Sequence, residues 1–132
     1  MFKKMLTSAM DIYNLAYAPY SGFKVSACIL SHDNNIYSGV NVENSAFPEG
    51  MCAEASAISS MVSNGEQIIK EILIISDSDK LCAPCGGCRQ KLNEFKNDDI
   101  LIHLCNLKGK KETFLLSELL PLSFGPDYLR IS

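Results

Sequence analysis

Two cysteine-containing segments constrain the fold of this chain most strongly, because both are needed to build one site. Cys52-Ala53-Glu54 places a carboxylate two residues after a thiol, and the stretch from Pro84 to Gln90 carries Cys85 and Cys88 around two glycines. Thiolates are zinc ligands, and a helix N-terminus favours the thiolate form of cysteine. We therefore expect a fold that brings two helix N-termini together around one metal ion.

The number of protein ligands decides what kind of zinc site this is. Structural zinc has four protein ligands, whereas catalytic zinc has three and keeps a position for water. Cys82 is the main candidate for a fourth ligand, since Cys28 and Cys105 lie in apolar strand patterns typical of the core. His32 in a polar turn and His103 in a strand are more typical of surface and core positions. Cys82 also begins an iron–sulfur-like run, but no further cysteine follows shortly afterwards.

Glu54 is a candidate general base beside this metal. A glutamate in the first turn of a helix is often only a solvated residue that the helix dipole stabilises. A zinc ion held by three thiolates, however, acidifies water less than one held by three imidazoles. A base that accepts the proton of that water and returns it later would therefore assist the reaction.

The order of the predicted elements indicates a layered α/β domain with a mixed sheet. Apolar residues recur at helical spacing near the N-terminus and after Cys52, whereas short apolar runs bounded by turn residues predict strands. The predicted helices are 1–17, 52–64 and 86–95, and the predicted strands are 23–30, 36–42, 72–75 and 100–104. A turn is predicted at 96–99, and 112–116 is either a last strand or a turn.

The length and charge of the chain limit the kinds of partner that it is expected to have. A chain of 132 residues is expected to form a single domain, 1–132. Its 12 basic and 15 acidic side chains give a net charge of −3, which disfavours a nucleic-acid partner. Asp11 and Asn14 interrupt the N-terminal apolar segment, so neither a signal peptide nor a membrane contact is expected. The chain is expected to be cytoplasmic, with its six cysteines reduced.

Beyond these patterns, the two cysteine segments resemble those of the small, homotetrameric zinc-dependent cytidine deaminases. The resemblance covers nearly the whole chain and includes three further segments: Tyr17 to Val25, Gly39 to Asn44 and Leu119 to Phe124. It implies a three-layer α-β-α sandwich with a mixed five-stranded sheet. The implied reaction is hydrolysis of cytidine and 2′-deoxycytidine to the uridines and ammonia, in pyrimidine salvage.

The resemblance also implies roles for individual residues. Cys52, Cys85 and Cys88 would bind one Zn²⁺ per subunit, and Glu54 would carry protons to the pyrimidine N3 and the departing ammonia. The nucleoside would contact the remaining residues: Phe23, Phe47 and Ala53 at the base, Asn41 and Glu43 at the ribose, and Phe124 from a neighbouring subunit of the homotetramer.

Two positions depart from the family pattern, and other functions remain open. Many members have an arginine directly after the glutamate, where this chain has Ala55, and Arg89 is a candidate to compensate. Phe47 stands where tyrosine is common. The alternatives are a deaminase of a modified nucleoside such as blasticidin S, a deaminase of a base within RNA, and a structural zinc domain closed by Cys82.

Overall fold

A mixed five-stranded sheet forms the centre of the computed structural model, which describes residues 1–129. The strand order is β2-β1-β3-β4-β5, and only the β3–β4 pair is parallel. The strands are β1 (Val25–Ser31), β2 (Ile36–Val40), β3 (Ile69–Ser76), β4 (Lys96–Asn106) and β5 (Lys111–Leu115). The helices are α1 (Phe2–Tyr13), α2 (Ala53–Ser63), α3 (Gly86–Glu94) and α4 (Leu116–Leu119), with short 3₁₀ turns at Phe47–Glu49 and Pro126–Tyr128.

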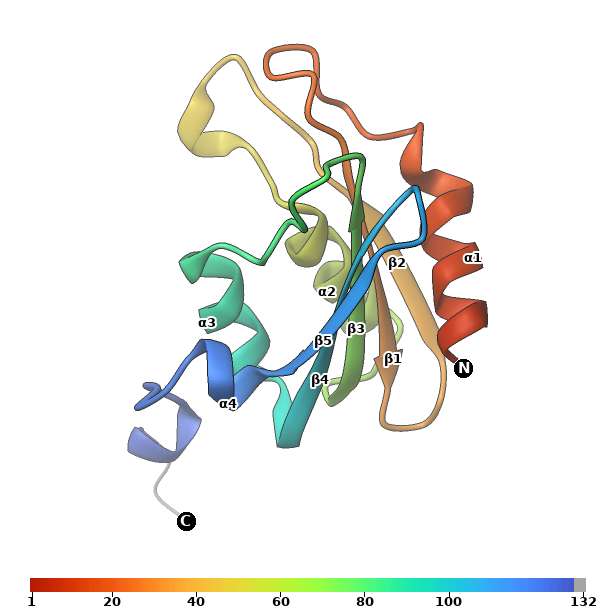
Figure 1. Ribbon diagram of the computed structural model, residues 1–132. Coiled ribbons are helices and arrows are strands. Elements are labelled where there is room, and N and C mark those ends of the chain that lie inside the picture. Colours follow the sequence, from red (N-terminus) through yellow and green to blue (C-terminus); the bar gives the residue numbers. More distant parts are fainter. Residues whose placement is uncertain (130–132) are drawn as a thin grey trace.

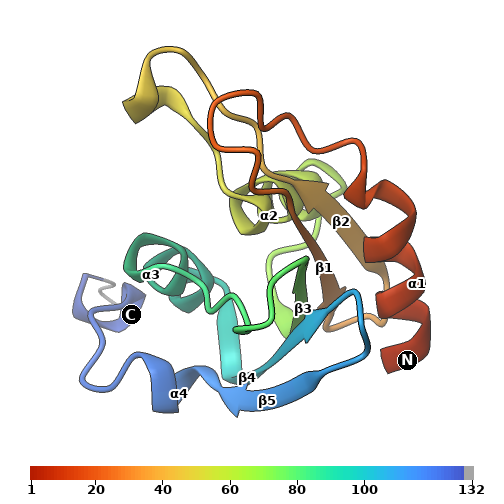
Figure 2. The same ribbon diagram turned by 45° about the horizontal axis from the view of Figure 1, so that its top comes forward.

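Helices cover both faces of this sheet and make three layers (Figure 1). Met5 and Ala9 of α1 pack on one face, against Cys28 and Leu73. On the opposite face α2 and α3 bury a larger apolar cluster that includes Ala57, Met61 and Leu92 (Figure 2). The central strand β3 is therefore apolar over both faces from Ile72 to Ile75. The expected α-β-α sandwich is confirmed.

Several predicted boundaries differ from the structure, two of them by four residues. The first helix ends at Tyr13, four residues before the expected end. Residues 96–99, predicted to form a turn, are the first part of β4, which starts directly after α3. Lys96 pairs with Ile69 there, and the register shifts before Leu101 pairs with Glu71. The strand thus starts in polar, exposed residues that have little strand propensity of their own, with Lys96 paired to β3 and the register shift following it.

The described part of the chain, 1–129, contains no helix both long and apolar enough to cross a bilayer.

Candidate metal centre and adjoining cavity

The topology brings the N-termini of α2 and α3 to the same end of the sheet. Helix α2 leads into β3, whereas α3 follows β3 and leads into the parallel strand β4. Each helix runs back along the sheet against the direction of β3, so both start beyond its carboxyl end. Ligands of open α/β sheets usually bind at this end.

Three cysteine sulfurs meet at these helix starts. Cys52 is the N-cap residue of α2, Cys85 is the N-cap residue of α3, and Cys88 lies in the first turn of α3. Their Sγ atoms lie within 4.8 Å of one another. A tetrahedral zinc with bonds of about 2.3 Å places its sulfurs roughly 3.8 Å apart, so a small contraction would complete the site. The three cysteines therefore fit a zinc ion.

In the absence of a metal ion, the pKa values of the three thiols are shifted in different directions. Burial raises the pKa of the Cys52 and Cys88 thiols, and the Glu54 carboxylate raises the pKa of Cys88 further. Burial also opposes ionisation of Cys85, but the backbone and side chain of Cys88 donate towards it and lower its pKa overall. Three thiolates beside a carboxylate need a bound cation to persist together.

Glu54 is placed beside the metal centre and is almost completely buried, with 5% of its surface exposed. Burial raises the pKa of its carboxyl group, which the Cys88 thiol and the Lys91 ammonium partly offset. Because it sits in the first turn of α2, next to Cys52, its backbone position is fixed by the helix. A buried carboxyl group with a raised pKa is suited to both accepting and returning a proton.

A cavity of about 390 Å³ opens onto this centre. Its volume lies in the range of small-molecule sites. Of the residues expected to form the site, the following line it: Phe23, Asn41, Glu43, Phe47, Cys52, Ala53, Glu54 and Cys85. Phe124 does not line it.

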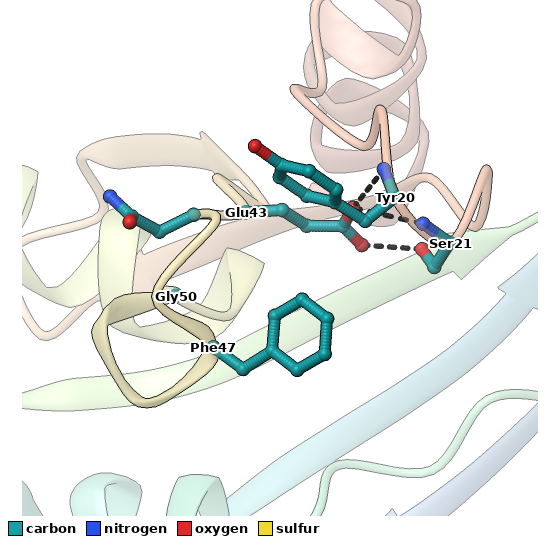
Figure 3. Close-up of a pocket in the computed structure, with 6 residues that line it drawn as sticks. Tyr20, Ser21, Glu43, Phe47 and Gly50 are labelled. Carbon is teal, nitrogen blue, oxygen red and sulfur yellow. Dashed lines mark hydrogen bonds between the residues drawn. The ribbon is translucent and has the colours of Figure 1, made fainter.

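The two polar residues expected at the ribose already hold the loop beside them. Asn41 Oδ1 accepts a hydrogen bond from the Val25 amide and its Nδ2 donates to the Phe23 carbonyl, both at 2.9 Å. Glu43 accepts hydrogen bonds from the backbone amides of Tyr20 and Ser21 at 3.0 and 3.1 Å, and from the Ser21 hydroxyl (Figure 3). The Ser21 hydroxyl is the main cause of a lowered Glu43 pKa. Glu43 is thus an ionised anchor for this loop.

A second hollow next to the first shows a residue that sequence analysis missed. Tyr20, Ser21, Glu43 and Phe47 line a space of about 330 Å³ (Figure 3). The Tyr20 and Phe47 rings meet edge to face, with their centroids 6.1 Å apart. Tyr20 lies within the segment that resembles the deaminases, but no sequence pattern indicates that its ring contacts Phe47.

The Arg89 guanidinium is bonded away from the thiols. Its Nε donates to the Pro84 carbonyl at 2.8 Å and its NH1 donates to the Leu119 carbonyl at 2.9 Å. Within residues 1–129 no hydrogen bond joins it to a cysteine sulfur. Arg89 therefore fixes the loop before Cys85 against the C-terminal segment.

Among residues 1–129, Cys52, Cys85 and Cys88 form the only group of three or more His, Cys, Asp or Glu side chains whose ligand atoms lie close enough together to hold a metal ion. Cys82 lines the cavity, but its sulfur donates to the neighbouring Ala83 carbonyl at 3.8 Å. The other two cysteines are core residues, as expected, and His103 is bonded to Glu71 and Thr113. The arrangement favours three protein ligands.

Replacing Cys82 with serine is therefore expected to leave one zinc per chain. The measurement is metal content by mass spectrometry after removal of loose metal on a desalting column. Cys88→Ser serves as the matched control and should lose most of the zinc, because it removes a ligand. If the Cys82 variant lost as much zinc as the control, the hypothesis of a site with four cysteine ligands would be supported instead.

Residues 2–104 match the family model described as the cytidine and deoxycytidylate deaminase zinc-binding region. The chain belongs to this deaminase family. A cytidine deaminase from Sporosarcina psychrophila is 38% identical over 127 residues, covering 96% of this chain and 93% of the relative. One from Mycoplasma genitalium is 40% identical over 114 residues, covering 86% and 87%.

Solved structures of the deaminase family share the fold. The crystal structure of cytidine deaminase from Burkholderia pseudomallei superposes with a TM-score of 0.88 at 31% identity, covering 94% of this chain and 99% of that one. That of the Mycobacterium tuberculosis enzyme gives 0.81 at 30% identity, covering 94% and 97%. Membership in a zinc-binding family and the geometry of the three sulfurs agree, so Cys52, Cys85 and Cys88 are the zinc ligands.

Proposed function

We propose that the chain hydrolyses cytidine and 2′-deoxycytidine to uridine and 2′-deoxyuridine, with release of ammonia. The observation that carries this proposal is the buried Glu54 carboxyl group beside three zinc ligands, at a cavity large enough for a nucleoside. The relatives named cytidine deaminase, similar over nearly the whole chain, support the same substrate class.

The cavity walls suggest how the nucleoside is held. Phe23 and Phe47 offer ring faces for the pyrimidine, and the backbone of Ala53 is close enough to the metal centre to contact the base. Asn41 uses only part of its hydrogen-bonding capacity on the loop, since an amide can make up to four bonds. Asn41 thus retains capacity for ribose hydroxyls while it holds Phe23 and Val25. Glu43 holds Tyr20 and Ser21 through three of the roughly four hydrogen bonds that a carboxylate can accept, so it too has capacity left.

Glu54 performs the proton transfers in this proposal. When bound, zinc supplies an acidified water as the nucleophile for C4 of the pyrimidine. Glu54 accepts one proton of that water and delivers it to N3, and then moves the remaining proton of the hydroxyl added at C4 to the exocyclic nitrogen. The C4–N bond breaks as the C4 carbonyl forms, and the nitrogen leaves as ammonia. One water is consumed and one ammonia is released. Burial keeps the carboxyl group out of bulk solvent, so the proton stays within the site.

Turnover by the zinc-loaded protein tests the activity directly. The rate at which the absorbance of cytidine or 2′-deoxycytidine decreases should be proportional to the concentration of the protein. One ammonia should appear for each nucleoside consumed. A zinc-loaded protein that converts neither nucleoside would refute the proposal, and turnover of blasticidin S alone would move the function to a modified nucleoside.

We propose further that the chain assembles as a homotetramer in which Phe124 reaches a neighbouring site. The Phe124 ring is 53% exposed and stacks on Tyr128 with 5.0 Å between centroids. Its carbonyl accepts hydrogen bonds from Gln90 and Asn93 of α3, which fixes the segment that presents the ring. An exposed, fixed aromatic ring is suited to contact across an interface.

Phe124→Ala is accordingly expected to lower kcat/KM for cytidine about tenfold, the effect of losing one aromatic packing contact. Kinetics and sedimentation velocity measure the two consequences, and Leu15→Ala, which removes another exposed apolar side chain, is the control. A fully active monomer would contradict both the assembly and the role of Phe124.

A further inference from the structure

The charges of the metal centre do not balance. A divalent cation held by three thiolates leaves one negative charge uncompensated, and the neighbouring Glu54 carboxylate adds a second when ionised. Excess negative charge makes any water in the site less acidic. It also disfavours the thiolate form of the three cysteines. Some cation close to the sulfurs is therefore expected on electrostatic grounds.

Two other residues close to the ligands in sequence do not place a cation on the sulfurs. Ala55, in the first turn of α2, has no charge. Arg89, next to Cys88, donates to the Pro84 and Leu119 carbonyls. Arg89 keeps its charge but directs its donors to these carbonyls, so a cation that can approach the sulfurs more freely must come from another residue around the site.

Lys91 is in position to do so. The point that a Cβ atom on Gly87 would occupy lies 3.8 Å from Lys91 Nζ and 3.9 Å from Cys85 Sγ, so the ammonium and this ligand sulfur are within about 8 Å of each other. That separation is about one Debye length at physiological ionic strength.

The surroundings leave the Lys91 ammonium available for this role. It lines a hollow beside the metal centre together with Cys52, Ala55 and Glu94. Glu94 is the acid in this hollow, yet in the described part of the chain no ion pair joins it to Lys91, and the two ion pairs present involve other residues. Within residues 1–129, therefore, no hydrogen bond or ion pair of the side chain holds the ammonium away from the sulfurs.

We propose that Lys91 is the charge-compensating residue of the zinc site. Its ammonium offsets the excess negative charge of the thiolates and Glu54, and thereby raises the affinity for zinc. Lys91 acts through the ligands and is a positioning residue, with no contact to the nucleoside. The inference deepens the proposed function, on which it rests for the importance of Glu54, but its prediction concerns metal affinity and can be tested without substrate.

The decisive experiment compares zinc affinity in Lys91→Gln and wild type by competition with a chromogenic chelator. Affinity should fall about two- to threefold, as expected for loss of an exposed charge within about 8 Å of a ligand sulfur. Lys91→Arg keeps the charge and should bind zinc like wild type. The loss in Lys91→Gln should shrink at high salt, because screening already weakens the contribution of the exposed ammonium in wild type.

Two further variants separate charge from packing. Lys4→Gln removes an equal charge from α1, on the other face of the sheet, and should leave zinc affinity unchanged. Ala55→Arg combined with Lys91→Gln places a new cation in the same hollow and should recover most of the lost affinity. The cobalt-substituted proteins should all keep a three-thiolate absorption spectrum, which shows that the ligands themselves are intact.

Zinc affinity of Lys91→Gln equal to that of wild type would overturn the inference, as would an equal loss in Lys91→Arg. Neither result would touch the proposed function if wild type converts cytidine. Conversely, a wild type that binds zinc but leaves cytidine unchanged would refute the function, while the affinity series would still decide the role of Lys91.

Discussion

Replacing Glu54 with glutamine is expected to lower kcat for cytidine by about 10³-fold or more, while zinc stays bound. Glutamine has nearly the same shape but cannot accept the proton of the attacking water, and loss of a general base costs up to about 10⁴-fold. No other base can easily take over this role. Glu54 is only 5% exposed to solvent, and Glu43, the other carboxylate at the cavity, is held by Tyr20 and Ser21.

Single-turnover kinetics and metal content should be measured together on this variant. Glu43→Gln is the matched control: it changes a carboxylate of the same cavity to an amide, and we expect a raised KM with much less effect on kcat. A buried amide costs less than a buried carboxylate. The free energy of unfolding of Glu54→Gln should therefore be at least equal to that of wild type. A variant with wild-type kcat would remove Glu54 from the proton transfers.

The metal centre could be predicted from sequence because it depends on local patterns. Cys85 and Cys88 are held by one helix start, and Cys52 by another, so the residue types and spacing carry most of the geometry. The order of elements then required the two helix starts to lie at the same end of β3. The fold class followed from the same order, since only a layered α/β arrangement accommodates it.

Other features depend on contacts between distant segments, and the sequence did not reveal them. Residues 96–99 are polar, yet they form the start of β4, where Lys96 pairs with Ile69 of β3. Arg89 is adjacent to a zinc ligand in sequence, yet its guanidinium is bonded to the Pro84 and Leu119 carbonyls. The lysine near the metal centre, Lys91, was not a candidate in the sequence at all. Side-chain direction, which one sequence does not specify, decides both cases.

Substituting alanine for Gly39 is expected to destabilise the protein by about 3 kcal/mol, because α2 packs directly on the backbone of β2. A Cβ atom at this position would lie 2.5 Å from the Ala57 amide nitrogen and 2.6 Å from the Ser56 Cβ. Both neighbours belong to a helix that is anchored by the buried side chains Ala57 and Met61, so neither can withdraw cheaply. Overpacking of a rigid contact costs about 1–3 kcal/mol, and a backbone clash lies at the upper end.

The consequence extends to the metal centre, since pushing α2 away from the sheet moves Cys52 and Glu54 together. Thermal unfolding of the zinc-loaded protein at fixed concentration should show a Tm lower by about 10 °C. Gly86→Ala is the matched control, because a Cβ there has no atom within 4 Å, and it should change stability by less than about 1 kcal/mol. Equal Tm values for Gly39→Ala and wild type would show that α2 can shift freely on β2, and the rigid placement of Glu54 argued from this packing would then be wrong.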